Sequence, residues 1–208
     1  MDALDEALRA RDPDRWLSSR FVGDACARGR LVALYSLDGE WARVAGAVTT
    51  PLAGEIRFAW WSEALERFAA GAPAEHPALA ALGREAVGRL LAPLEAVVEA
   101  RRLALDGGAP SDAADVALMA AAIRLLDPEA PEAATLGAAR AWAAARSDDP
   151  ASALNWLAGA EPGLCDLSVA AFPAVAHVTL ARAYAAGRRP GELEKRARIT
   201  WAVLRGRV

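Results

Sequence analysis

Apolar residues recur along most of this chain at the three- and four-residue spacing of α-helices, and β-branched residues are sparse. From near Asp24 towards Ala47 they form one stripe, which consists of Leu34, Leu37, Trp41 and Val44. Thr50-Pro51 is typical of a helix start, and a second stripe follows it, which consists of Phe58, Trp61, Leu65 and Phe68. Gly71-Ala72-Pro73 ends that stripe. The pattern predicts two long helices joined by a short turn.

Similar patterns predict helices in the rest of the chain. A short helix is expected to begin at Asp12-Pro13 and to carry Trp16 and Phe21. Later helices are expected over residues 78–91, 93–106, 113–126, 131–146, 167–186 and 190–205, with a short segment around Trp156. The sequence GGAPSD at 107–112 is a candidate linker. We therefore predict an all-α, single-domain helical bundle over residues 1–208, with a motif-bearing half at 13–106 and a second half at 113–208 that is shortened.

The amino-acid composition limits the kinds of partner that the protein is expected to bind and the compartment in which it is expected to work. With 24 basic and 27 acidic residues the net charge is −3, so no nucleic-acid partner is expected. The arginine-rich last quarter is consistent with a solvated face or with a patch for anionic lipid or an acidic partner. Cys26 and Cys165 form no CxxC pair, which predicts neither a metal site nor a disulfide. No signal peptide and no run of 18 apolar residues is evident, so we expect a cytoplasmic protein, either soluble or peripheral at the inner face of the membrane.

Carboxylate pairs are the first candidates for chemistry, because Mg²⁺ takes oxygen ligands. The clear pair at helical spacing is Glu95 and Glu99, but Arg101 and Arg102 follow it, so surface ion pairs are the expected outcome. Trp60 lies at the edge of the second apolar stripe, where an indole either packs against another helix or lines a groove.

The two histidines have no partner at metal-ligand spacing. His76 precedes Pro77 and is expected to cap a helix start. His177 lies in an apolar run and is expected to be a satisfied core residue rather than a catalytic base.

The sequence GEIRFAWWSEALE at 54–66, with RGRLVALYSLDGEWARV before it and HPALAAL after it, resembles the squalene and phytoene synthase family. That family consists of head-to-head prenyltransferases with the all-α isoprenoid-synthase fold. The similarity is dense over residues 13–82. It is thinner at LGAARAWAAARSDDP and FPAVAHVTLARAY, which lie where the family has its second aspartate helix and its penultimate helix.

The resemblance implies two aspartate motifs that bind Mg²⁺ and diphosphate, and this chain departs from both. Counting from Tyr35, the family's arginine falls on Gly39 and its DDxxD falls on residues 42–46, Ala-Arg-Val-Ala-Gly. The second motif falls near 146–152, where Asp148 remains and Pro150 would break the helix. Family members are also longer, so connecting helices are expected to be missing around 107–165, leaving a smaller cavity.

Without these aspartates the chain is closest to a branch of the family that includes the mitochondrial complex I assembly factor, which implies a role in assembling or supporting a respiratory membrane complex. We therefore predict a non-catalytic protein with no cofactor, no metal and no catalytic residue. The groove that is the active site in the family is expected to bind a protein partner or an isoprenoid or other lipid in this chain. The predicted groove residues are Tyr35, Asp38, Gly39, Arg57 and Trp60.

Two alternatives remain open. The first is a prenyltransferase that uses Mg²⁺ on relocated carboxylates, namely Glu40, Glu95 and Glu99. The second is a structural subunit in which side chains fill the groove beside Tyr35.

Overall fold

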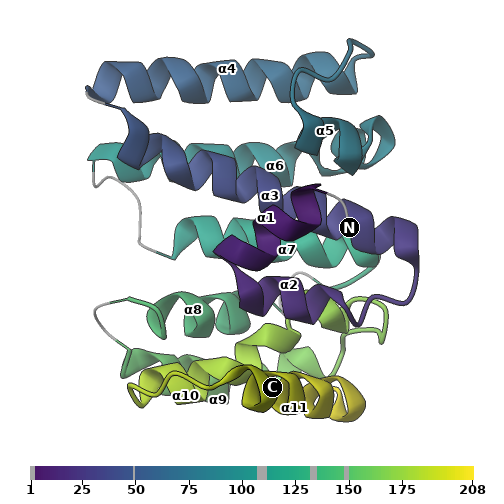
Figure 1. Ribbon diagram of the computed structural model, residues 1–208, viewed down its shortest axis with the longest axis vertical. Coiled ribbons are helices and arrows are strands. Elements are labelled where there is room, and N and C mark those ends of the chain that lie inside the picture. Colours follow the sequence, from purple (N-terminus) through teal and green to yellow (C-terminus); the bar gives the residue numbers. More distant parts are fainter. Residues whose placement is uncertain (1–2, 49, 107–111, 132–134, 148–149) are drawn as a thin grey trace.

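The part of the chain that the structure describes is mostly helical. A computed structural model describes residues 3–48, 50–106, 112–131, 135–147 and 150–208. These residues form eleven α-helices and no strand, and the structure is 76% helical. The all-α prediction is therefore confirmed. Figure 1 shows the helices stacked along the long axis, from α4 (Pro51–Ala69) at one end to α11 (Glu192–Arg205) at the other.

The central element is α3 (Ala25–Ala47), which packs against the N-terminal helices α1 (Ala3–Arg11) and α2 (Pro13–Ser19). Its start is fixed by Asp24, whose carboxylate accepts the Ala27 N–H at 2.5 Å. The predicted stripe is buried along its whole length, from Leu34 to Val44. Each large apolar side chain buried in this way stabilises the fold by about 1.5–3 kcal/mol.

The next helix, α4, begins as predicted, because the Thr50 hydroxyl accepts the Ala53 N–H at 3.4 Å and Pro51 occupies the first helical position. Its apolar stripe is buried and faces α6 (Arg84–Leu103). Three large apolar side chains on α4 remain exposed, namely Leu52, Ile56 and Trp60. One face of α4 is therefore available at the surface beside α3.

The prediction of separate helices at 78–91 and 93–106 is wrong. The break lies at Gly83, between α5 (Pro77–Leu82) and α6, and Gly83 has φ +87°, a conformation that L side chains rarely adopt. Pro93 lies inside α6 instead of starting a helix. Its ring removes one backbone hydrogen bond, and the buried residues on either side of it, Leu90 and Leu94, offset that cost.

The second half also differs from the predicted helices. The helix expected at 113–126 is present as α7 (Ala113–Leu126), but α8 spans only Leu136–Ala144 and the short segment around Trp156 is a 13-residue helix, α9 (Ser152–Leu164). The candidate linker falls almost wholly outside the described residues, since it includes 107–111.

The long helix predicted at 167–186 is also wrong. This segment forms two 3-10 turns, η3 (Phe172–Ala174) and η4 (Ala176–Leu180), followed by α10 (Ala181–Ala185). Pro173 cannot donate the backbone hydrogen bond that a continuous helix would require of it. Residues 171–181 are also buried nearly all round, so tertiary packing decides their local conformation.

None of the helices that the structure describes combines the length and the apolar character needed to cross a lipid bilayer.

Candidate functional site

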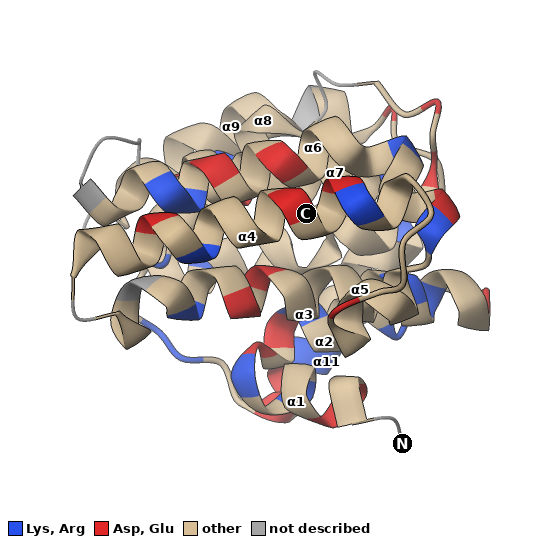
Figure 2. Ribbon diagram, turned by 90° about the horizontal axis from the view of Figure 1, so that it is seen from above, with Lys and Arg blue, Asp and Glu red and all other residues tan. Residues whose placement is uncertain are grey.

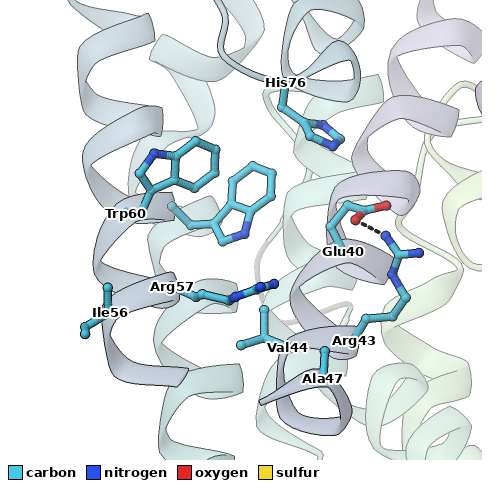
Figure 3. A pocket seen from close by; sticks show the side chains of 9 residues that line it. Glu40, Arg43, Val44, Ala47, Ile56, Arg57, Trp60 and His76 are labelled. Carbon is cyan, nitrogen blue, oxygen red and sulfur yellow. Dashed lines mark hydrogen bonds and ion pairs between the residues drawn. The ribbon is translucent and has the colours of Figure 1, made fainter. Parts of the chain in front are cut away.

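A groove of about 590 Å³ opens between the second half of α3 and α4 (Figure 3). The helix α3 contributes Glu40, Arg43, Val44 and Ala47, α4 contributes Ile56, Arg57, Trp60 and Trp61, and His76 closes one end. Two of the five predicted groove residues, Arg57 and Trp60, therefore line it. The exposed face of α4 supplies the apolar wall of a site that is open to solvent.

Aromatic rings form the inner wall of this groove. The Trp61 ring lies edge-on to Trp60, with centroids 4.8 Å apart, and to His76 at 5.2 Å. The His76 Nδ1 accepts the Ala78 N–H at 3.2 Å, which confirms the predicted helix cap and fixes the imidazole against the wall. These contacts hold a firm apolar surface beside the groove.

The mouth of the groove carries more positive than negative charge. Arg43 is ion-paired with Glu40, its neighbour one turn away on α3. Arg57 has no ion-pair or hydrogen-bond partner among the residues that the structure describes, and Figure 3 shows its side chain directed from α4 towards Val44 of α3. An unpaired guanidinium beside indole rings suits a ligand that joins an anionic group to an apolar body.

The other three predicted groove residues lie apart from this groove, on a different side of α3. Tyr35 and Asp38 are only 3% and 5% exposed. The Tyr35 hydroxyl donates to the Ala174 carbonyl at 3.4 Å. Gly39 is buried as well. The structure therefore places Tyr35, Asp38 and Gly39 in the interior of the bundle, where α1, α2 and α3 meet.

A buried arginine organises that interior. Arg15 of α2 donates to Asp115 of α7 at 2.5 Å and lies 3.5 Å from carboxylate oxygens of both Asp12 and Asp38. Its guanidinium also stacks over the Tyr35 ring at 5.5 Å. Burial alone would lower the Arg15 pKa, but the three carboxylates outweigh it and raise that pKa above its ordinary value.

Further arginines complete this network, which we call the Arg15 cluster and which consists of Asp12, Arg15, Asp38, Arg101, Asp115 and Arg146. Arg101 of α6 donates to Asp38 at 2.8 Å, and Arg146 lies 3.8 Å from Asp12. Burial alone would raise the Asp115 pKa, but Arg15, Arg146 and Arg101 together hold that pKa below its usual range. Figure 2 shows residues of both signs close together where α1, α2 and α3 meet.

Gly39 leaves room for an arginine from another helix. A Cβ at residue 39 would clash with the Cζ of Arg11, whose Nη2 donates to the Tyr35 carbonyl at 3.0 Å. The Arg11 guanidinium therefore occupies the space that a side chain on residue 39 would need.

His177 lies beside the Arg15 cluster and is fully buried. Its ring meets Trp142 edge-on at 4.7 Å, and neither ring nitrogen has a hydrogen-bond partner among the described residues. It is a core residue, as predicted, but an unsatisfied one. Burial, reinforced by the charges of Arg15 and Arg146, lowers its pKa well below the ordinary histidine value, so the ring is neutral in the folded protein.

Comparison with known proteins assigns the chain to a family. A model of the squalene/phytoene synthase family matches residues 8–121, which is more than half of the sequence. The chain belongs to the squalene/phytoene synthase family. Its all-α structure agrees with the isoprenoid-synthase fold of that family. No curated protein and no solved structure matches the chain.

Within this family, residues 42–46 stand where the resemblance places the first aspartate motif, and two of them, Arg43 and Val44, line the α3/α4 groove. Position 39, where the family's arginine falls, is the glycine whose side-chain space the Arg11 guanidinium fills. A guanidinium and an apolar side chain of the α3/α4 groove therefore lie at two of the positions to which the resemblance assigns that motif.

The region of the second aspartate motif is only partly described, because Asp148 and Asp149 lie outside the described residues. Arg146, which precedes them, joins the Arg15 cluster and stacks over Trp142 at 4.8 Å. α8 ends at Ala144, before the motif positions.

Arginines pair with two of the three carboxylates that could serve as relocated metal ligands. Glu99 accepts from both Nε and Nη2 of Arg102, at 2.7 Å and 2.6 Å, and this bonding lowers its pKa. Glu40 is paired with Arg43, and Glu95 lies half-buried on α6. Across the described ranges no three His, Cys, Asp or Glu side chains are grouped so as to hold a metal ion.

Sequence reasoning missed the members of the Arg15 cluster other than Asp38. Asp12, Arg15, Arg101 and Arg146 lie in charged stretches that are typical of surfaces. Asp115 did carry a signal, because it is the one carboxylate in the apolar sequence of α7, AADVALMAAAIRLL. A lone acid on such a helix is usually paired with a buried base.

Proposed function

We propose that this chain is a non-catalytic member of the squalene/phytoene synthase family and that its α3/α4 groove binds a lipid, such as an isoprenoid with an anionic end, or a protein partner of similar chemistry. The observation that carries this proposal is the position of Arg43. It lines the groove at a place where the family's motif would supply a metal-binding aspartate.

Charge supports a binding role over metal-dependent turnover. A guanidinium repels Mg²⁺, and Glu40, the carboxylate that lines the groove among the described residues, is already paired with that guanidinium. Arg57 is free to contact an anion, and Trp60 and Trp61 offer apolar surface next to it. Such a site would bind the anionic end and the chain of a lipid without activating a leaving group.

The resemblance to the branch that contains the complex I assembly factor supports a second part of the proposal, namely that the partner belongs to a respiratory membrane complex. Leu52 and Ile56 on α4 leave apolar surface beside the groove for such a contact.

The alternative is a prenyltransferase with Mg²⁺ on Glu40, Glu95 and Glu99, and the arginine pairs of Glu40 and Glu99 disfavour it. A purely structural role is favoured only on the Tyr35 side of α3, where Arg15 and its partners fill the interior. The groove beside Trp60 is open.

Binding can be separated from turnover with farnesyl monophosphate, which has an isoprenoid chain and an anionic end but no pyrophosphate to release. We expect it to bind the purified protein in a calorimetric titration. Arg57→Gln should weaken binding by at least about tenfold, because a charge-assisted hydrogen bond contributes roughly 1.5–3 kcal/mol. Trp60→Ala should weaken the binding of both farnesyl monophosphate and uncharged farnesol.

The matched control is Arg89→Gln, which removes an exposed arginine of α6 that does not line the groove. It should bind as the unaltered protein does. Equal affinities for Arg57→Gln, Trp60→Ala and the control would contradict a lipid site in this groove.

A further inference from the structure

The outer face of α11 carries an apolar stripe. Leu193, Trp201 and Leu204 are 83%, 56% and 74% exposed, and the exposed Ala197 lies between the first two. At 100° per residue these four positions fall within about 80° of the helix circumference. We call them the α11 stripe. An exposed apolar stripe of this kind is costly in water unless something covers it.

The opposite face of α11 holds the helix on the bundle. Ile199 and Ala202 are buried, and α11 packs against η4 and α2. Lys195 lies 2.8 Å from Asp14 of α2, which also accepts the Tyr184 hydroxyl at 2.5 Å. Burial and that acceptor raise the pKa of Tyr184 to about 12, so the hydroxyl keeps its proton. The α11 stripe therefore faces away from the core, because the opposite face of the helix packs on the bundle.

Arginines flank the α11 stripe on both sides. Arg196 lies on one side of it and Arg205 on the other, and Arg207 follows the end of the helix. All three are exposed, and within the described part of the chain none of them forms an ion pair. The Arg205 guanidinium lies 4.4 Å from the centre of the Trp201 ring. Arginine next to tryptophan and leucine on one helix face is the pattern of a helix that lies at a lipid surface.

The distribution of charge along the chain indicates that α11 would bind anionic lipid. Between Arg182 and Arg207 there are eight basic and two acidic residues, in a protein whose net charge is −3. The rest of the chain is therefore strongly acidic and would be repelled by anionic phosphates, whereas α11 would be attracted. α11 also lies at the opposite end of the long axis from α4 (Figure 1), so one end of the molecule can meet a membrane while the groove stays accessible.

We propose that α11 is a membrane-binding face: the α11 stripe enters the headgroup region of an anionic lipid bilayer, and the flanking arginines contact the lipid phosphates. A basic residue next to an anionic membrane contributes about a fivefold gain in binding. The apolar stripe supplies the part of the binding that salt does not screen.

Co-sedimentation with lipid vesicles tests this proposal. The protein should bind vesicles of phosphatidylglycerol and phosphatidylcholine in equal parts, and bind pure phosphatidylcholine much more weakly. Arg196→Gln combined with Arg205→Gln should weaken binding to the anionic vesicles about 25-fold. Trp201→Ser combined with Leu204→Ser should weaken it at least tenfold, at both low and high salt.

Two control variants match these changes at surfaces that lie away from α11. Arg89→Gln removes an exposed arginine of α6, and Leu103→Ser removes an exposed leucine at the end of the same helix. Both should bind as the unaltered protein does, and all variants should unfold at the same temperature because none of the changed side chains is buried.

Three results would overturn the proposal. The first is no binding to anionic vesicles. The second is binding that the α11 variants leave unchanged. The third is self-association at micromolar concentration that Trp201→Ser and Leu204→Ser abolish, which would assign the stripe to a second copy of the chain.

Discussion

Arg15→Met is expected to lower the free energy of unfolding by about 3–5 kcal/mol, a large share of the roughly 5–15 kcal/mol that domains of this kind possess. Arg15 is fully buried between the carboxylates of Asp12, Asp38 and Asp115. Methionine fills similar volume but leaves these carboxylates facing one another in the interior. The measurement is urea unfolding followed by circular dichroism, with the midpoint compared at neutral pH.

Arg102→Met is the matched control. Arg102 also bonds to two carboxylates, Glu99 and Glu55, but at the surface. Its removal should hardly move the midpoint, because exposed ion pairs contribute little. A second variant, Arg15→Met with Asp115→Leu, should recover part of the lost free energy of unfolding. It also removes the Asp115 carboxylate, which Arg15→Met leaves without its partner. If Arg15→Met unfolds at the same urea concentration as the unaltered protein, Arg15 does not hold the interior together.

The free energy of unfolding is also expected to change strongly with pH. The folded state keeps His177 neutral, because its pKa lies well below 6.5, whereas the unfolded chain takes up a proton as the pH falls through about 6.5. The unfolded state therefore binds more protons, and the unfolding free energy should fall as the pH drops from 7 to 5.5. The slope should approach about 1.4 kcal/mol per pH unit.

His177→Leu removes the imidazole. It should therefore make the free energy of unfolding depend less on pH between pH 7 and pH 5.5, whatever it does to stability at pH 8. Above pH 7.5 the curves of the two proteins should run parallel, which is the internal control. Urea unfolding at a series of pH values measures both. An equally steep slope in His177→Leu would show that another group near Arg15, Arg146 and Asp115 takes up the proton.

The fold class followed from local patterns, whereas the buried site did not. The stripes from Leu34 to Val44 and from Phe58 to Phe68 predicted α3 and α4 because each lies on one buried helix face. The Arg15 cluster joins residues as many as 100 positions apart, and no local pattern carries such a pairing. Asp115, isolated on an apolar helix, carried a signal of a buried base nearby, which the sequence analysis did not use.

The errors in the helix boundaries also have physical causes. A helix was predicted to begin at Pro93, but packing keeps Pro93 inside α6. One helix was predicted to continue through Pro173, but the buried segment there adopts 3-10 turns. Gly83 ends α5 because its backbone has positive φ, which sequence spacing does not reveal. For the groove, Trp60 was predicted from its place at the edge of an apolar stripe, and Arg57 was predicted with it on the same helix. Tyr35, Asp38 and Gly39 lie inward of that groove, because α3 is buried on more than one side.

The central claim is that the arginines of the α3/α4 groove bind an anionic lipid where the family's motif would hold a metal, so that no diphosphate is cleaved. The most direct measurement is pyrophosphate release from farnesyl or geranylgeranyl diphosphate by the purified protein in the presence of Mg²⁺. We predict release no faster than in the protein-free blank. Release that rises in proportion to protein concentration and stops when Mg²⁺ is chelated would contradict the account.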